Sequence, residues 1–470
     1  MPLFNGLKPT KLRPITNPQV LVVNTRVEHL FTVLDSHMDC SFWKIVLALV
    51  LFTACDPNIQ EAEVPFEFEE GKLDFSNYVA VGDEITAGFQ DNELFFSGQL
   101  NSYPSLLNTQ FILFGDHRFI SPFMYDDVGF GNRVALGYKH DCNDVEELTI
   151  VDYEGESNPR NFERWQGARL NNLGIPELKI SDLEARRYHQ VNPYWSRVAH
   201  DDNQLVLERV SAENPTFFTV WLGLNDILKW AESGGIYVTT DAHFPTSDVQ
   251  FRRNLGHLLD SLMVNGAKGL IGNIPDITDF PFFELIPRNA LTLTQEQADQ
   301  LNVLYAFNPE VNFKEGENNF IVQDFGLPRH VKEEERILLS VDIDSIKCGG
   351  YGSVIPFGSV HVLLEEEIGV IKEYIAIYNN IIEELAAERN IPVVDFNQWY
   401  RQIQDKGILW NGVNTNYTFV TGGFFSMDGL FPTQRGAALI ANEWLKVLEE
   451  QYGVKLPMLN PNEFEGVNLP

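Results

Sequence analysis

Short apolar runs alternate with longer amphipathic segments along most of the chain after residue 77. Four of these runs are followed by a turn or a polar cluster and predict buried strands, at 78–81, 217–222, 269–272 and 391–396. Apolar residues at helical spacing predict helices at 103–111, 248–265, 363–389 and 433–450. This alternation predicts an α/β fold, with a doubly wound, flavodoxin-like parallel sheet covered by helices on both faces.

Two long stretches, 115–215 and 282–358, do not follow this alternation of strand and helix patterns. Stretches of this length are usually functional or carry small elements of their own, so we expect insertions that roof a pocket. In open parallel sheets, ligands bind beyond the carboxyl ends of the strands. The polar residues that follow the predicted strands are therefore candidate site residues: Asp83, Glu84, Asn225, Asp226, Asn273 and Asp276.

The apolar run at 42–54 is shorter than the roughly 20 residues that a membrane-spanning helix needs. It runs directly into Cys55 and resembles the lipobox of bacterial lipoproteins, in which this cysteine is lipidated. Read from Met38, residues 38–54 form a compact lipoprotein signal peptide. We therefore expect an exported protein that is lipid-anchored in the bacterial cell envelope, facing the periplasm or the cell surface. The expected parts are an upstream extension at 1–37, the signal peptide at 38–54, a tether at 55–72, a folded domain at 73–455 and a C-terminal tail at 456–470.

The charge balance excludes one class of partner. The chain has 66 acidic and 34 basic residues, a formal net charge of −32, and such a surface repels nucleic acid. None of the four cysteines, Cys40, Cys55, Cys142 and Cys348, has the CxxC spacing of a zinc or redox site. We therefore predict neither a metal nor a cofactor, and whether Cys142 pairs with Cys348 stays open.

Three polar segments at predicted strand ends or a helix start carry a family resemblance. They are Val-Gly-Asp-Glu-Ile-Thr-Ala-Gly at 81–88, Gly-Leu-Asn-Asp at 223–226 and Asp-Gly-Leu-Phe-Pro-Thr at 428–433. In this order and spacing they resemble the conserved blocks of the SGNH (GDSL-type) hydrolases, or GDSL-like lipases and acylhydrolases. A softer match, Asn-Leu-Gly-Ile-Pro-Glu at 172–177, stands where the family has its glycine block. The resemblance implies the SGNH-hydrolase fold, with insertions over the pocket.

The resemblance also implies a set of site residues. In the family a serine attacks an ester carbonyl, a histidine takes the proton of that serine, and an aspartate orients the histidine. Here Asn225 matches an oxyanion donor and Asp428 matches the triad acid, but Glu84 stands at the serine position and Phe431 at the histidine position. Glu177 occupies the place of the oxyanion glycine. Since a phenyl ring cannot accept a proton, we predict that the standard ester-cleaving mechanism is absent.

Several hypotheses for the site follow. In the leading one the site is a degenerate pocket, so that the chain is a pseudoenzyme that could still bind a small-molecule, glycan or acyl-ester ligand. Glu177, Asp83 and Asp226 would contact this ligand. Aromatic residues that would suit sugar rings or acyl chains are Phe95, Phe96, Tyr194, Trp195, Trp230, Phe424 and Phe425.

Two alternatives keep the chain an active hydrolase. In one, an esterase uses displaced groups, for which the candidates are Ser97, Ser102, His200, His243 and His257. In the other, the carboxylates of Asp83, Glu84, Asp226 and Asp428 converge, as paired carboxylates do in glycoside hydrolysis or around a hard cation.

Overall fold

The computed structural model of the chain describes residues 73–115, 118–236 and 243–470. The expected upstream extension, signal peptide, lipidated Cys55 and tether, which together cover residues 1–72, lie outside the described residues. Within the described ranges, no helix combines the length and the apolar character that crossing a membrane requires.

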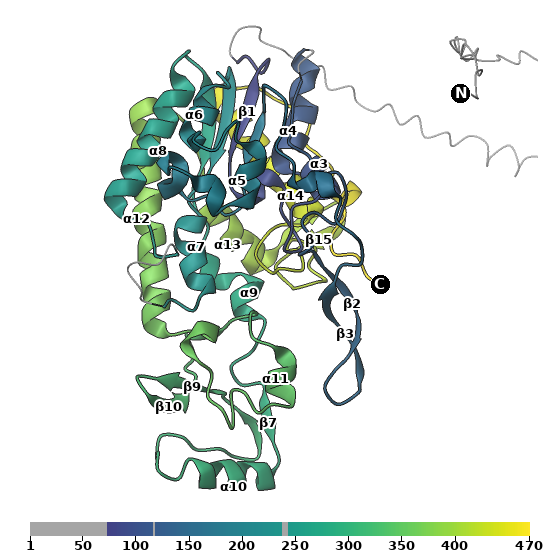
Figure 1. The fold of residues 1–470 in the computed structure, drawn as a ribbon, viewed down its shortest axis with the longest axis vertical. Helices are drawn as coiled ribbons and strands as arrows, with labels where there is room; N and C mark the ends of the chain where they lie inside the picture. The colour runs from purple at the N-terminus through teal and green to yellow at the C-terminus, as the bar shows by residue number, and fades with distance from the viewer. Residues whose placement is uncertain (1–72, 116–117, 237–242) are drawn as a thin grey trace, which may run out of the picture. The chain divides into compact units, whose positions relative to one another are not determined.

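A five-stranded parallel sheet forms the centre of the domain (Figure 1). Its strands are β1 (Tyr78–Gly82), β4 (Asn172–Gly174), β5 (Phe217–Trp221), β6 (Lys268–Gly272) and β13 (Val393–Val394). They lie in the order β13-β6-β5-β1-β4, and every neighbouring pair is parallel. Numbered along the chain this order is 2-1-3-4-5, the flavodoxin-like doubly wound arrangement, so the predicted fold class is confirmed.

Helices cover both faces of the sheet. In Figure 1, α6 (Val206–Ser211), α8 (Asp248–Met263) and α12 (Glu365–Arg389) lie on one side, and α4 (Tyr103–Phe111) and α14 (Gln434–Tyr452) lie on the other. The four predicted helices are therefore present, with ends that differ by a few residues at most. The other helices of the α/β core are α2 (Glu84–Ala87), α3 (Phe96–Leu100), α7 (Asn225–Glu232) and α13 (Phe396–Lys406).

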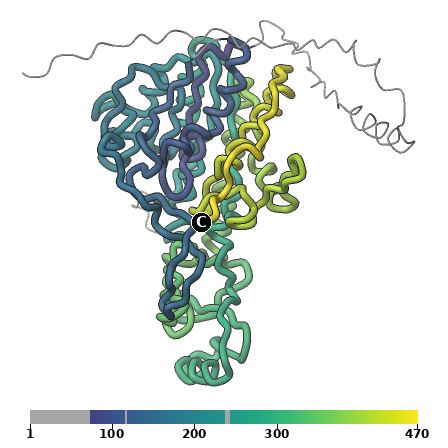
Figure 2. The backbone as a smooth tube through the Cα atoms, turned by 90° about the vertical axis from the view of Figure 1, so that its right-hand side faces the viewer, coloured from purple at the N-terminus to yellow at the C-terminus, as the bar shows by residue number. Residues whose placement is uncertain are grey.

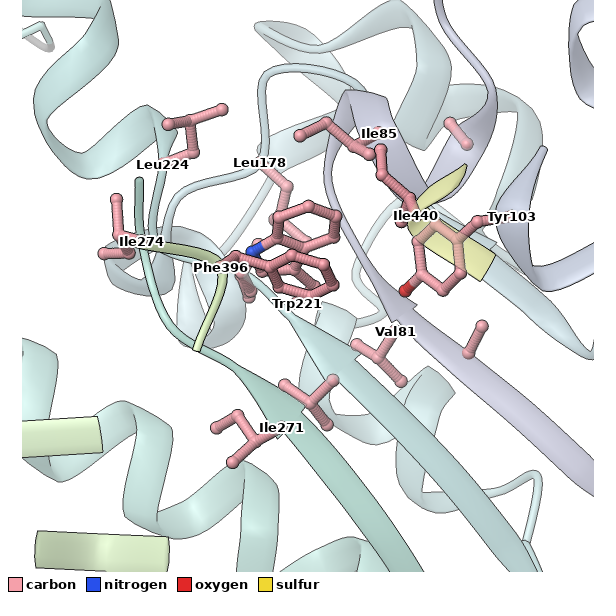
Figure 3. Close-up of a cluster of buried hydrophobic side chains, with 14 of the residues drawn as sticks. Val81, Ile85, Tyr103, Leu178, Trp221, Leu224, Ile271, Ile274, Phe396 and Ile440 are labelled. Carbon is pink, nitrogen blue, oxygen red and sulfur yellow. The ribbon is translucent and has the colours of Figure 1, made fainter. Parts of the chain in front are cut away.

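Large buried side chains fix the carboxyl ends of the strands. The indole of Trp221, the last residue of β5, stacks on the ring of Phe396 with the centroids 3.8 Å apart. Around this pair lie Val81 from β1, Ile271 from β6 and Ile440 from α14 (Figure 3). Since both faces of the sheet contribute to this packing, the loops that leave the strands start from fixed positions.

The first insertion contains a hairpin and a short helix. The hairpin is formed by β2 (Val134–His140) and β3 (Glu146–Asp152), and α5 (Pro193–Val198) lies closer to the sheet. The α5 segment packs on the main core through Tyr194 and Trp195. The stretch 115–215 also supplies β4 and α6 to the α/β core, so it is an insertion only in part.

The second insertion builds two small hydrophobic cores of its own, centred on Phe320 and Phe357 and on Leu301 and Phe313. It therefore differs from a simple roof. Its elements are α9 (Pro281–Glu284), β7 (Leu291–Leu293), α10 (Gln295–Leu304), β8 (Gly316–Asn318), β9 (Ile321–Asp324), β10 (Leu327–His330), β11 (Arg336–Ile337) and α11 (Ile343–Lys347). The short strand β12 (Val362–Leu363), which pairs with β11, leads from it into α12.

A disulfide between Cys142 and Cys348 joins the two insertions, with the Cα atoms 6.4 Å apart. In Figure 2 the blue hairpin runs beside the green second insertion. Lys347, next to the disulfide, forms ion pairs with Asp141 and Glu147 of the hairpin segment. The question of cysteine pairing that the sequence left open is thereby answered.

The last residues pack onto the domain rather than forming a separate tail after residue 455. Leu456 belongs to the main core, and Leu459 exchanges two hydrogen bonds with Asn442 of α14. Asn462 donates to the carbonyl oxygen of Trp410 in a small hairpin, formed by β14 (Ile408–Trp410) and β15 (Val413–Thr415). The folded domain therefore extends beyond the predicted boundary.

Candidate functional site

Three of the predicted site residues follow neighbouring strands at the point where the strand order reverses. Glu84 follows β1, Glu177 follows β4 and Asn225 follows β5. The chain can turn tightly here because Gly82 has no side chain. A Cβ at this position would collide with the carbonyl oxygen of Trp221 and with Thr86. Glycine at position 82 therefore allows β1, β5 and α2 to approach one another closely.

The carboxylate of Glu84 accepts a hydrogen bond at each oxygen. The backbone N–H of Glu177 donates to Oε1 at 2.8 Å, and Nδ2 of Asn225 donates to Oε2 at 2.6 Å. Glu177 holds its N–H in this direction with a φ of 66°, a left-handed conformation that glycine adopts more readily. These are the two donors that the family resemblance assigns to an oxyanion. By that resemblance, the side chain of Glu84 takes the place of the oxyanion; the residue is 1% exposed.

Burial dominates the electrostatics of Glu84. It raises the pKa of this carboxyl group to about 7, against the opposing effects of the Lys229 charge and the hydrogen bond from Asn225. Lys229 lies one helical turn after Asn225, and its Nζ atom is 3.4 Å from Oε1 of Glu177. A cation therefore lies near the two donors and favours an anion between them.

Asp83 and Asp226 are also buried, and their carboxylates bond to the protein itself. Asp83 caps α2 by accepting from the backbone N–H of Ile85 at 3.3 Å, and Asp226 accepts from the N–H of Ile180 at 2.7 Å. Burial, followed by the charge of Glu84, raises the pKa of Asp83 well above its ordinary value. Burial raises the pKa of Asp226 to about 7. Both residues are at most 2% exposed, so in this conformation neither side chain contacts a ligand from solvent.

Asp428 has a different set of partners. Its Oδ1 atom accepts from the backbone N–H groups of Leu430 and Phe431, both at 2.8 Å. Its Oδ2 atom accepts from Oγ of Ser426 at 2.8 Å and from the N–H of Asn92 at 3.1 Å. Burial raises the pKa of Asp428 to about 6. The carboxylate thus fixes the turn that precedes α14.

The ring of Phe431 lies in a run of aromatic contacts. It packs edge-on against Phe89, the second residue after α2, with a centroid distance of 5.4 Å. Phe89 contacts Tyr194, Tyr194 contacts Phe130, and Phe130 stacks on Phe162. Phe162 is 62% exposed, whereas Phe431 is 4% exposed. Position 431, which the sequence resemblance aligns with a histidine, is therefore part of an apolar layer that extends from the surface to the neighbourhood of α2.

Most of the aromatic residues proposed for ligand stacking are core residues instead. Phe95, Tyr194, Trp195, Trp230, Phe424 and Phe425 are all buried. Only Phe96 is exposed among the seven. Their burial follows from their positions, because most of them pack in the main hydrophobic core beside the sheet. In the described conformation, these six rings are too buried to contact a sugar or an acyl chain.

Two of the displaced candidates, Ser102 and His257, have other partners in the described part of the chain. Ser102 is buried and bonds to Ser105, and His257 is an exposed partner of Glu184 on the outer face of α8. A serine–histidine contact that the sequence did not indicate joins Ser340 and His361 at 3.5 Å. This distance is at the upper limit for a hydrogen bond, and no carboxylate bonds to His361 in the described part of the chain. Across the same residues, no cluster of His, Cys, Asp or Glu is arranged to hold a metal ion.

Comparisons with known proteins give structural likeness alone. No family model and no curated protein matches the chain. A lipase/acylhydrolase from Enterococcus faecalis is similar over 81% of this chain and 97% of its own, with 12% identity and a TM-score of 0.31. An alpha/beta hydrolase enzyme from the metagenome of Lake Arreo, Spain, is similar over 80% of this chain and 95% of its own, with 12% identity and a TM-score of 0.32. At these values the fold assignment rests on the sheet order and connections described above.

Proposed function

We propose that this chain is an exported, lipid-anchored protein with an SGNH-hydrolase-like fold that does not cleave esters by the serine mechanism. In this proposal the chain binds a glycan or an acyl-ester ligand without turning it over. One observation carries the loss of the serine mechanism in this proposal: the carboxylate of Glu84 accepts hydrogen bonds from the N–H of Glu177 and from Nδ2 of Asn225.

The geometry explains why such a site would not act on an ester. Oxyanion donors accelerate acyl transfer because they are free to receive the negative oxygen as it forms. Here both donors already bond to a carboxylate of the protein, which must move before an ester oxygen can approach. The serine nucleophile is replaced by this same Glu84, and the proton acceptor is replaced by Phe431, which packs against Phe89.

The disulfide supports the proposed location. Disulfides persist in oxidising compartments such as the periplasm and the cell surface, and they are rare in the cytosol of most organisms. The bond between Cys142 and Cys348 is partly exposed to solvent and joins two insertions. Export is therefore the setting in which this bond would be stable, and it agrees with the lipoprotein signal expected at residues 38–54.

Hydrolysis of p-nitrophenyl acetate and butyrate tests the proposal. Wild type is expected to show no hydrolysis above background. The double variant Glu84→Ser with Phe431→His places a hydroxyl and an imidazole in the family's positions and frees both oxyanion donors. We expect only weak recovery, because Asp428 is engaged with Ser426 and Asn92. Each single variant should remain inactive, since neither alone completes the proton transfer.

A further variant, Glu84→Ala, separates the alternatives. Wild-type hydrolysis that survives Glu84→Ala would contradict the proposal and favour a displaced nucleophile. Wild-type hydrolysis that is abolished by Glu84→Gln would favour carboxylate chemistry instead. An inactive double variant would be informative only if its circular dichroism matches wild type, in which case the loss of activity is not explained by positions 84 and 431 alone.

A further inference from the structure

A cleft opens at the same edge of the sheet, two strands away from Glu84. It has a volume of about 350 Å³ and lies at the carboxyl ends of β6 and β13, against α12 and the start of α13. Asn273 and Asp276 line it after β6, and Asp395 lines it after β13. The carboxyl edge of an open parallel sheet is where ligands bind in this class of fold.

Hydrogen bonds within the protein hold the floor of the cleft in place. Asn273 is 4% exposed, donates to Oδ1 of Asp395 at 2.8 Å and accepts from the N–H of Asn397 at 2.8 Å. Asn379 of α12 both donates to and accepts from the backbone of Ile274 at 2.8 Å. The side chains are thus oriented before any ligand arrives, which lowers the entropy cost of binding.

The rim and walls of the cleft retain unused donors and acceptors. Asp395 and Asp276 each use only Oδ1 within the described chain, so that each keeps a second carboxylate oxygen. Lys372 and Arg401 are exposed at the cleft and form no ion pair within 4 Å in the ranges that the structure describes. Acidic groups line the same cleft, so hydrogen-bond acceptors and cationic donors face one space.

Free carboxylate oxygens beside cationic side chains favour one class of ligand. A hydroxyl group both donates and accepts hydrogen bonds, so a polyol can use carboxylate oxygens and cationic donors at the same time. Asp276, Glu383 and Asp395 outnumber Lys372 and Arg401 by one, and the net charge of −32 adds to the repulsion of an anion. We infer that this cleft is a binding site for an uncharged saccharide unit, separate from the site around Glu84.

Ligand-observed NMR and isothermal titration calorimetry on the whole domain test this inference. The probes are glucose, N-acetylglucosamine and cellobiose, with diglycine as a zwitterion and inorganic phosphate as an anion. The variant Lys372→Ala with Arg401→Ala removes two exposed donors that make no hydrogen bond in the described fold, so it should fold as wild type. Lys406→Ala, farther along α13 and outside the cleft, is the matched control.

We expect at least one of the sugars to bind wild type, with a dissociation constant that rises tenfold or more in Lys372→Ala with Arg401→Ala. Lys406→Ala should leave this constant unchanged, so that the loss is assigned to the two cations that line the cleft. The inference is overturned if none of the three sugars binds at millimolar concentration or if the double variant binds as tightly as wild type. Binding of diglycine or phosphate alone overturns it as well.

Discussion

The cost of burying Glu84 can be measured as a pH dependence of stability. Burial raises the pKa of Glu84 from about 4.5 to about 7, so between these values the folded protein holds a proton that the unfolded chain has released. Stability contributed by this proton is present at low pH, is lost as the pH rises through the pKa of the folded state, and changes little above it. Between pH 5 and pH 8 the loss amounts to about 2.5 kcal/mol.

The variant Glu84→Gln removes the titration while it retains the shape of the side chain. An amide has one acceptor oxygen, so one of the two hydrogen bonds that Glu84 accepts, from the N–H of Glu177 or from Nδ2 of Asn225, is lost. This cost of roughly 1–3 kcal/mol does not depend on pH. The difference in the free energy of unfolding, Glu84→Gln minus wild type, should therefore increase by about 2.5 kcal/mol from pH 5 to pH 8.

Urea denaturation at several pH values, followed by tryptophan fluorescence, measures this difference directly. Buried carboxyl groups whose pKa Glu84 does not shift, such as Asp226, cancel in the comparison. Asp83 does not cancel, because the charge of Glu84 raises its pKa; without that charge the difference between the proteins changes in the same direction. Glu366→Gln, a neutralised carboxylate on the exposed face of α12, is the control and should follow wild type at every pH. If the stabilities of Glu84→Gln and wild type run parallel from pH 5 to pH 8, the burial argument for Glu84 is wrong.

Three further predictions concern the disulfide between Cys142 and Cys348, the lipidation of Cys55 and the packing of Phe396. Replacing Cys142 and Cys348 by serine should lower the free energy of unfolding by up to about 5 kcal/mol, because the bond spans 206 residues; a loss below about 1 kcal/mol in urea titrations would show that the insertions are held together without it. Cys55→Ser should leave the precursor unprocessed and unlabelled by a fatty-acid probe, and labelling equal to wild type would contradict the lipoprotein prediction. Phe396→Ala should cost about 3–5 kcal/mol because the side chain is fully buried, whereas Phe325→Ala, at a fully exposed position, should cost almost nothing by thermal denaturation; similar losses would refute the packing argument.

The sequence predicted the long elements of the fold well, because periodicity accumulates over many residues. Helix α12 spans 25 residues, and its apolar stripe was sufficient to place it. The three-residue strand β4 was not predicted as a strand, since so short a segment has no readable period. The start of α13 was predicted as strand, because the apolar Phe396 follows the two residues of β13 after a single polar residue, Asp395, which caps the helix.

The candidate site was predictable in part. That Glu84 and Asn225 meet follows from strand topology, since β1 and β5 are neighbours and both residues stand just beyond their carboxyl ends. The hydrogen bonds that place the Glu84 carboxylate between the two donors depend on atomic positions that no sequence pattern encodes. The aromatic contacts from Phe431 through Tyr194 to Phe162 join segments far apart along the chain, so no local pattern could predict them.

The disulfide also bears on how the protein matures. If the chain is exported as proposed, Cys142 emerges with its thiol free, and Cys348 follows 206 residues later. Four cysteines allow three complete pairings. If Cys40 is removed with the signal peptide and the thiol of Cys55 is consumed by lipid, only two thiols remain, and a single intramolecular pairing is possible. Lipid attachment would then ensure correct oxidation, and the native bond could form without a step of disulfide reshuffling.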